Sequence, residues 1–111
     1  MKRDRIELSA PLSFWGGYDP QTGAITDPTH PQCGEVLTGK IVVMAKTIGS
    51  TSAPGALLES IRLGTGPAGF ELAEHDDVII VAAQLARSLY GMDVAVTIVR
   101  PGDRGPGRSG R

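Results

Sequence analysis

One short segment limits the fold of this chain more than any other: the unbroken apolar run IVVMA at residues 41–45. Such a run is typical of a strand that is buried on both faces, as in the middle of a parallel sheet. It is followed by Gly49, by three hydroxyl residues and by a Pro-Gly pair, after which apolar residues recur at helical spacing. We therefore expect a central strand that leads into a helix through a glycine-containing turn.

The rest of the chain alternates between strand and helix patterns. We expect a strand over residues 6–15, a long turn-rich excursion over 16–35, and further strands over 67–74 and 92–99. Phe, Tyr and Trp together number only five, so Val, Ile, Leu and Ala must supply most of the core. The order of elements predicts a mixed α/β domain with two main helices.

The two helices are expected between the later strands. The first begins near Ser52, which is placed to cap it, and ends at Gly64. The second begins at Asp76 or Asp77 and ends at Gly91. Its predicted buried face consists of apolar residues at helical spacing, namely Val78, Val81, Ala82, Leu85 and Leu89.

Length and composition restrict the class of protein. A chain of 111 residues can fold as one domain, and its single cysteine, Cys33, cannot form an intrachain disulfide. No apolar run approaches the ~20 residues that span a bilayer, and the N-terminus lacks a signal-peptide pattern, so we expect a cytoplasmic protein with no membrane partner. No basic footprint for nucleic acid is visible. We assign residues 1–7 to an N-terminal extension, 8–100 to the folded domain and 101–111 to a disordered tail.

The turn at residues 49–55 is the first candidate for a functional site. It precedes a helix, and the N-terminus of a helix offers unpaired amides and a positive dipole to an anion. A hydroxyl there, such as Ser50, can transfer a proton because those amides stabilise its alkoxide. The alternative is that the hydroxyls only cap and turn the chain. The turn lacks the Lys-Ser/Thr ending of a nucleotide P-loop. Residues 64–69, GTGPAG, match the dinucleotide-binding pattern G-x-G-x-x-G, but they follow a helix instead of opening one, so we discard this match.

Other chemistry-bearing residues give weaker signals. Asp27, His30 and Cys33 lie close in sequence, but they provide too few ligands for a structural zinc site or an iron–sulfur cluster. We expect His30 at the surface or in a hydrogen bond. His75, beside two helix-capping carboxylates, is interpreted as part of a charged cap. A serine hydrolase is disfavoured because no G-x-S-x-G motif occurs.

Several motifs in order resemble the small, swivelling domain of the aconitase X family. They are PLSFWGG.DP.TG.I.DP.HP..G, the strand GKIVVMAK, the turn GSTSAPGALLES, and AGFELAEHDDVIIVAAQLARSLYG, and together they cover residues 8–99. The resemblance implies a swivelling β/β/α fold. It also implies a large partner subunit that holds an iron–sulfur cluster, with no cofactor bound by this chain alone. Family members with known activity are hydro-lyases, among them cis-3-hydroxy-L-proline dehydratases and archaeal mevalonate 5-phosphate dehydratases.

The resemblance also assigns roles within the turn. Ser50, preceded by a glycine, matches the family's catalytic acid/base, while Gly49, Thr51 and Ser52 would bind a small anionic or amino-acid-like substrate. Ile48 departs from the family, because many relatives carry arginine there. The implied function is the small subunit of a heteromeric dehydratase, acting on cis-3-hydroxy-L-proline. The alternatives are a mevalonate 5-phosphate dehydratase small subunit and a non-catalytic module that binds a small anion.

Overall fold

Four parallel strands form the main sheet of the protein. The computed structural model describes residues 4–49 and 52–99. The strands lie in the order β1 (Arg5–Glu7), β4 (Ile41–Met44), β5 (Gly69–Leu72) and β6 (Ala95–Ile98). The run predicted to form a central strand is confirmed as β4, which pairs with β1 on one side and with β5 on the other.

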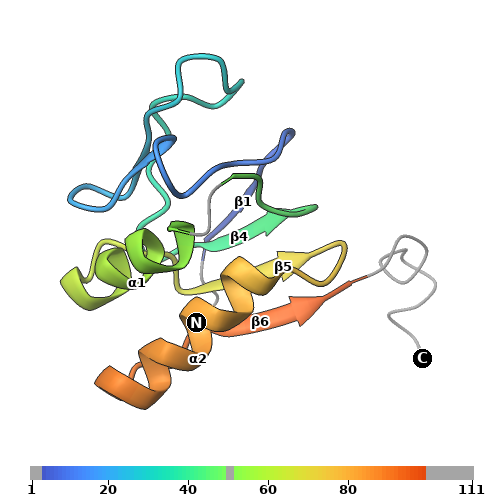
Figure 1. The fold of residues 1–111 in the computed structure, drawn as a ribbon. Coiled ribbons are helices and arrows are strands. Elements are labelled where there is room, and N and C mark those ends of the chain that lie inside the picture. The colour runs from blue at the N-terminus through green and yellow to red at the C-terminus, as the bar shows by residue number, and fades with distance from the viewer. Residues whose placement is uncertain (1–3, 50–51, 100–111) are drawn as a thin grey trace.

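Two helices connect the later strands and pack on one face of the sheet (Figure 1). They are α1 (Ala53–Leu63) and α2 (Asp77–Tyr90), and they lie side by side. Because the strand order runs in one direction, each strand-to-strand connection crosses the same face. The predicted α/β class with two main helices is therefore confirmed.

The N-terminal strand is shorter than the sequence pattern suggested. β1 ends at Glu7, inside the segment that we assigned to an N-terminal extension, and Leu8 donates one more backbone hydrogen bond to Val43 (2.8 Å). The predicted strand over 6–15 breaks there, and the chain pairs again only at Leu12, through a parallel bridge to Thr47. Pro11, which has no amide hydrogen to donate, lies in this interruption.

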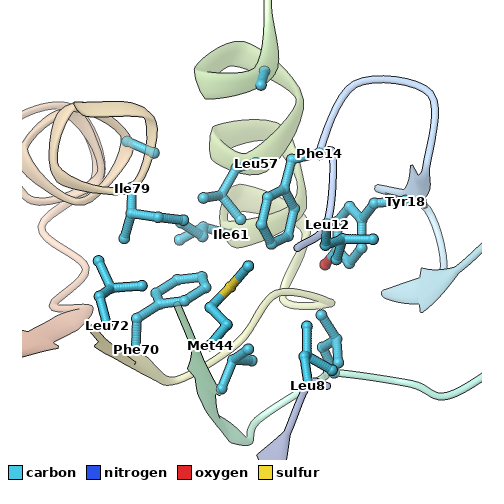
Figure 2. Packing of buried hydrophobic residues seen from close by; sticks show 14 of the residues in the cluster. Leu8, Leu12, Phe14, Tyr18, Met44, Leu57, Ile61, Phe70, Leu72 and Ile79 are labelled. Carbon is cyan, nitrogen blue, oxygen red and sulfur yellow. The ribbon is translucent and has the colours of Figure 1, made fainter. Parts of the chain in front are cut away.

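The long excursion between β1 and β4 folds over the same face as the helices. It contains a small antiparallel pair, β2 (Tyr18–Asp19) and β3 (Ala24–Ile25). Figure 2 shows side chains from the excursion, the sheet and both helices meeting in one core. The ring of Phe14 lies edge-on to those of Tyr18 and Phe70, with centroids 4.8 and 6.0 Å away. The excursion is thus part of the core and not a loose loop.

Both helices end where the sequence predicted, at glycines with left-handed backbone. Gly64 has φ 84° and Gly91 has φ 65°, and each donates backbone hydrogen bonds to the preceding turn. Among the described residues, neither helix is long and apolar enough to cross a membrane.

The prediction of the buried face of α2 is wrong in part. Ala82 is buried as predicted, with Ile79 and Ala86, whereas Val81, Leu85 and Leu89 are 39%, 38% and 60% exposed. The reason is that α2 packs against both α1 and the sheet, and the small side chains of Ala82 and Ala86 allow this close approach. An apolar ridge therefore stays on the outer side of the helix.

A group of hydroxyls, those of buried Tyr18 and Ser60 and of half-buried Thr65, joins the excursion to α1. The Tyr18 hydroxyl and the Ser60 Oγ are 2.6 Å apart, and Ser60 Oγ is 3.0 Å from Thr65 Oγ1. Thr65 Oγ1 in turn donates to the Pro20 carbonyl (2.5 Å). Burial raises the pKa of Tyr18 to about 12, with the Ser60 hydrogen bond acting in the opposite direction. Each hydroxyl has a partner, which offsets the cost of burying it.

Tyr18→Phe tests this group by its dependence on pH. The folded pKa of Tyr18 lies above the ordinary value of 10.0, so its stabilising effect is complete below pH 10 and is lost as the pH rises towards about 12. Tyr18→Phe should cost about 1 kcal/mol at neutral pH, because one buried hydrogen bond is removed. It should then lose less stability than the wild type across the alkaline window. Urea unfolding at several pH values measures both effects, and Tyr90→Phe, at an exposed position, is the control. Equal alkaline losses in wild type and Tyr18→Phe would contradict the prediction.

Candidate functional site

Three segments of the chain meet at the carboxyl edge of the parallel sheet. They are residues 8–15 after β1, residues 45–49 after β4 and residues 73–76 after β5. In open parallel sheets this edge is where ligands bind, because all strands deliver their connecting loops there. The Ile48 amide donates to the Leu12 carbonyl (3.2 Å), which fastens the segment after β4 to the segment after β1.

Asp76 holds the same segment from the other side. Its buried carboxylate accepts hydrogen bonds from the Thr47 amide (2.5 Å to Oδ2) and the Thr47 hydroxyl (2.8 Å to Oδ2). Its Oδ1 also accepts from the amides of Val78 (3.0 Å) and Ile79 (3.3 Å), so Asp76 is the N-cap of α2. One carboxylate therefore caps a helix and anchors the chain just before Gly49.

The backbone at Gly49 requires glycine. Its φ is +115°, a conformation that other residues rarely adopt. A Cβ at this position would lie 2.6 Å from Ser13 Oγ, so a side chain would collide with the segment after β1. Ser13 Oγ is itself held, because it donates to the Trp15 carbonyl (2.7 Å) and accepts from the Trp15 amide (3.2 Å).

The predicted site residues are described unequally. Ser50 and Thr51 lie outside the described residues, so the predictions for them remain predictions. Ser52 occupies the N-cap position of α1, as expected, but its side chain makes no capping hydrogen bond, because its backbone is helical (φ −83°, ψ −8°) instead of extended. Gly55 lies within α1 and not in the turn. The first turn of α1 carries no acidic residue, so the positive end of the helix is not neutralised by its own side chains.

An apolar groove of about 390 Å³ adjoins the start of α1. It is lined by Phe14, Trp15, Gly16, Tyr18, Pro20 and Ala56. Ala56 belongs to the first turns of α1, and Trp15, the single tryptophan of the chain, is 58% exposed. The groove and the turn before α1 therefore share one side of the molecule.

Asp27 and His30, two of the three residues considered as metal ligands, make other hydrogen bonds. His30 is buried, with Nε2 3.0 Å from the Ala10 carbonyl, and its Nδ1 accepts from the Gln32 amide (3.0 Å). This confirms a hydrogen-bonded His30. His75 Nε2 lies 2.7 Å from Asp77 Oδ1 at the surface, and Cys33 is exposed. Within residues 4–49 and 52–99, no three such side chains come together in a way that could hold a metal ion. These residues do not fit an iron–sulfur cluster, which requires several thiolates.

Sequence reasoning missed two residues of this site. Thr47 and Ser13 fix the turn, yet neither belongs to a motif that marks it. Asp76 was recognised as a helix cap, but not as the anchor of a residue 29 positions away. The one usable signal was the Asp76 cap itself, because Asp76 begins α2, and α2 follows β5, the strand next to β4.

The fold and site define a small α/β domain that carries a glycine turn and an apolar groove at one edge. Comparison with known proteins identifies its family. Residues 5–104 match the family model of the aconitase X swivel domain, and the chain belongs to this family.

Relatives carry two different names. The chain is 35% identical over 94 residues to a cis-3-hydroxy-L-proline dehydratase of Hypocrea jecorina, covering 85% of this chain and 16% of that protein. It is 43% identical over 74 residues to a phosphomevalonate dehydratase small subunit of Methanopyrus kandleri, covering 67% and 55%. The chain thus spans about a sixth of the first relative and about half of the second.

A solved structure agrees with the fold. The crystal structure of Thermococcus kodakaraensis aconitase X in its holo-form superposes with a TM-score of 0.74 at 26% identity, covering 83% of this chain and 67% of that chain. The swivelling fold predicted from the sequence is therefore confirmed.

Two glycine substitutions should have opposite effects on stability. Gly49→Ala should destabilise the domain by roughly 1–3 kcal/mol, because it forces a side chain into left-handed backbone and against Ser13. Gly55→Ala should stabilise it by about 0.5–1 kcal/mol, because a Cβ there meets open space and alanine favours a helix. Denaturant unfolding of both variants measures the difference. A Gly49→Ala variant as stable as Gly55→Ala would contradict the described backbone of the turn.

Proposed function

We propose that this chain is the small subunit of a heteromeric aconitase X-type hydro-lyase. In this proposal Ser50 is the catalytic acid/base, and Gly49, Thr51 and Ser52 contact the substrate. The partner is a large subunit, which carries the iron–sulfur cluster, and the complex works in the cytoplasm. The observation that carries the proposal is the position of the turn at the carboxyl edge of the sheet, directly before a helix N-terminus, in a chain of the aconitase X swivel-domain family.

The chemistry assigned to this chain is proton transfer. Dehydration removes a proton from one carbon and a hydroxyl from its neighbour, so one group of the enzyme must accept and return the proton. A serine hydroxyl is a poor base in water, but it becomes competent where solvent is excluded and positive dipoles stabilise the alkoxide. The start of α1, with no acidic residue in its first turn, supplies such a dipole three residues after Ser50 in the sequence.

The proposed partner surface is the side of the domain that bears the groove and the turn. Trp15, which lines the groove, is 58% exposed, and Ile48, just before the turn, is 48% exposed. Large exposed apolar side chains such as these are typical of a surface that a partner covers. Closure of a large subunit over this side would also exclude water from Ser50.

We propose a cis-3-hydroxy-L-proline-type substrate. Ile48 supports it, because an exposed apolar side chain next to the turn provides no charge to a phosphate group. Mevalonate 5-phosphate is the second candidate, favoured by the 43% identity to the Methanopyrus kandleri small subunit. A non-catalytic domain that holds a small anion at the same helix N-terminus is the alternative of a different class.

Assembly and turnover can be tested together. Coexpression with the large aconitase X subunit of the same organism should give a complex that contains iron and dehydrates cis-3-hydroxy-L-proline, while neither subunit acts alone. The fluorescence of Trp15 should shift to shorter wavelength on mixing, because the exposed indole becomes covered. If the complex dehydrates mevalonate 5-phosphate instead, the substrate assignment is wrong. A complex that is inactive on both compounds would favour the anion-binding alternative. Absence of any complex would refute the role as a subunit.

Ser50→Ala tests the catalytic assignment within that complex. Loss of a proton-transfer group typically lowers the rate by ~10²–10⁴, so kcat should fall by this factor while the complex still forms. Ser88→Ala is the matched control, since Ser88 is an exposed serine near the C-terminal end of α2, far along the chain from the turn. Melting temperatures of both variants should stay close to the wild-type value. Near-normal kcat in Ser50→Ala would transfer the acid/base role to the large subunit.

A further inference from the structure

The three residues before Ser50 are each held by a different contact. Thr47 gives both its amide and its hydroxyl to Asp76, at 2.5 and 2.8 Å from Oδ2. The Ile48 amide donates to the Leu12 carbonyl (3.2 Å), and Gly49 lies against Ser13. Neighbouring segments therefore fix the backbone of residues 47–49 on two sides, directly before Ser50 in the sequence.

The strongest of these contacts involves a charged group that is almost completely buried. Asp76 is 7% exposed, and burying a carboxylate is costly unless donors surround it. Capping of α2 uses only Oδ1, which accepts from the Val78 and Ile79 amides. Oδ2 is left for Thr47, whose hydroxyl also reaches Oδ1 at 3.0 Å. The two oxygens thus serve two segments, and the second contact is not needed to start the helix.

We propose that Asp76 is a positioning residue of the active site, acting through Thr47 to fix the backbone that presents Ser50. This inference rests on the proposed function and adds to it a residue 26 positions beyond Ser50 in the sequence. The physical reason is that proton transfer depends steeply on geometry, and a misplacement of about 1 Å can cost ~10²-fold in rate. A hydrogen bond to a carboxylate is short and strong, and here both donors of one residue are engaged, so Thr47 can neither rotate nor shift freely.

Asp76→Asn separates the two contacts of the carboxylate. Asparagine caps helices about as well as aspartate, because its Oδ1 still accepts from the amides of the first turn. Its NH₂ group, however, would face the Thr47 amide, so a donor would meet a donor where Oδ2 now accepts. Asp77→Asn is the matched control, since Asp77 is the next residue and its side chain is 88% exposed.

The expected result in the assembled enzyme is a fall of kcat by roughly 10- to 10²-fold in Asp76→Asn, with KM little changed and Asp77→Asn near wild type. Thr47→Val should lower kcat less, because the amide contact remains, and Thr47→Ser should restore it by returning the hydroxyl. If Asp76 had only a structural role, Asp76→Asn would have a lower melting temperature, but its kcat would be unchanged at temperatures where it is folded. If Asp76→Asn keeps the wild-type kcat while Ser50→Ala is inactive, this inference is wrong and the proposed function still stands.

Hydrogen exchange on the full chain without its partner gives a readout that needs no activity. In Asp76→Asn the Thr47 amide should exchange roughly tenfold faster than in Asp77→Asn, while the Val78 and Ile79 amides stay protected. This measurement tests whether Asp76 fixes Thr47 even if Ser50→Ala proves active or neither substrate reacts. Those two results would count against the proposed function and not against the contact. Unchanged Thr47 exchange would overturn the inference. If Asp76→Asn does not fold, the Thr47→Val and Thr47→Ser pair provides the same comparison.

Discussion

Parallel pairing of β4 with both β1 and β5 determines where the segments of the candidate site lie. Parallel strands that lie side by side end at the same edge, so the chain leaves β1, β4 and β5 at one place (Figure 1). The segments that follow these strands therefore contact one another although they are far apart in sequence. The turn before α1 lies between the other two, and each of them contacts it.

The contact with Asp76 links helix formation to the geometry of this turn. A buried carboxylate must be surrounded by donors, and those available at this edge are the amides of the first turn of α2 and both donors of Thr47. The hydrogen bonds that the Asp76 carboxylate accepts therefore join the start of α2 to the segment that follows β4. On the opposite side, Ser13 leaves room for Gly49 and for no larger residue.

The same edge also explains why we propose that the domain works with a partner. In the proposal, the groove beside Trp15 and the dipole of α1 serve binding and proton transfer, while the metal cofactor belongs to the partner. Family membership agrees with such a division, because relatives of this chain are named as small subunits or are much longer proteins. The proposed reaction thus divides its proton transfer and its cofactor between two chains.

By itself the sequence determined the α/β class, the central strand β4 and both helix ends, because these depend on local periodicity, glycine placement and capping chemistry. It did not determine which face of α2 is buried, since Val81 and Ala82 fit the same helical pattern and only packing against α1 and the sheet selects the smaller side chain. Nor did it reveal the contact of Asp76 with Thr47. That contact exists because the sheet brings two strand ends together, and no local pattern carries information about a neighbour 29 residues away.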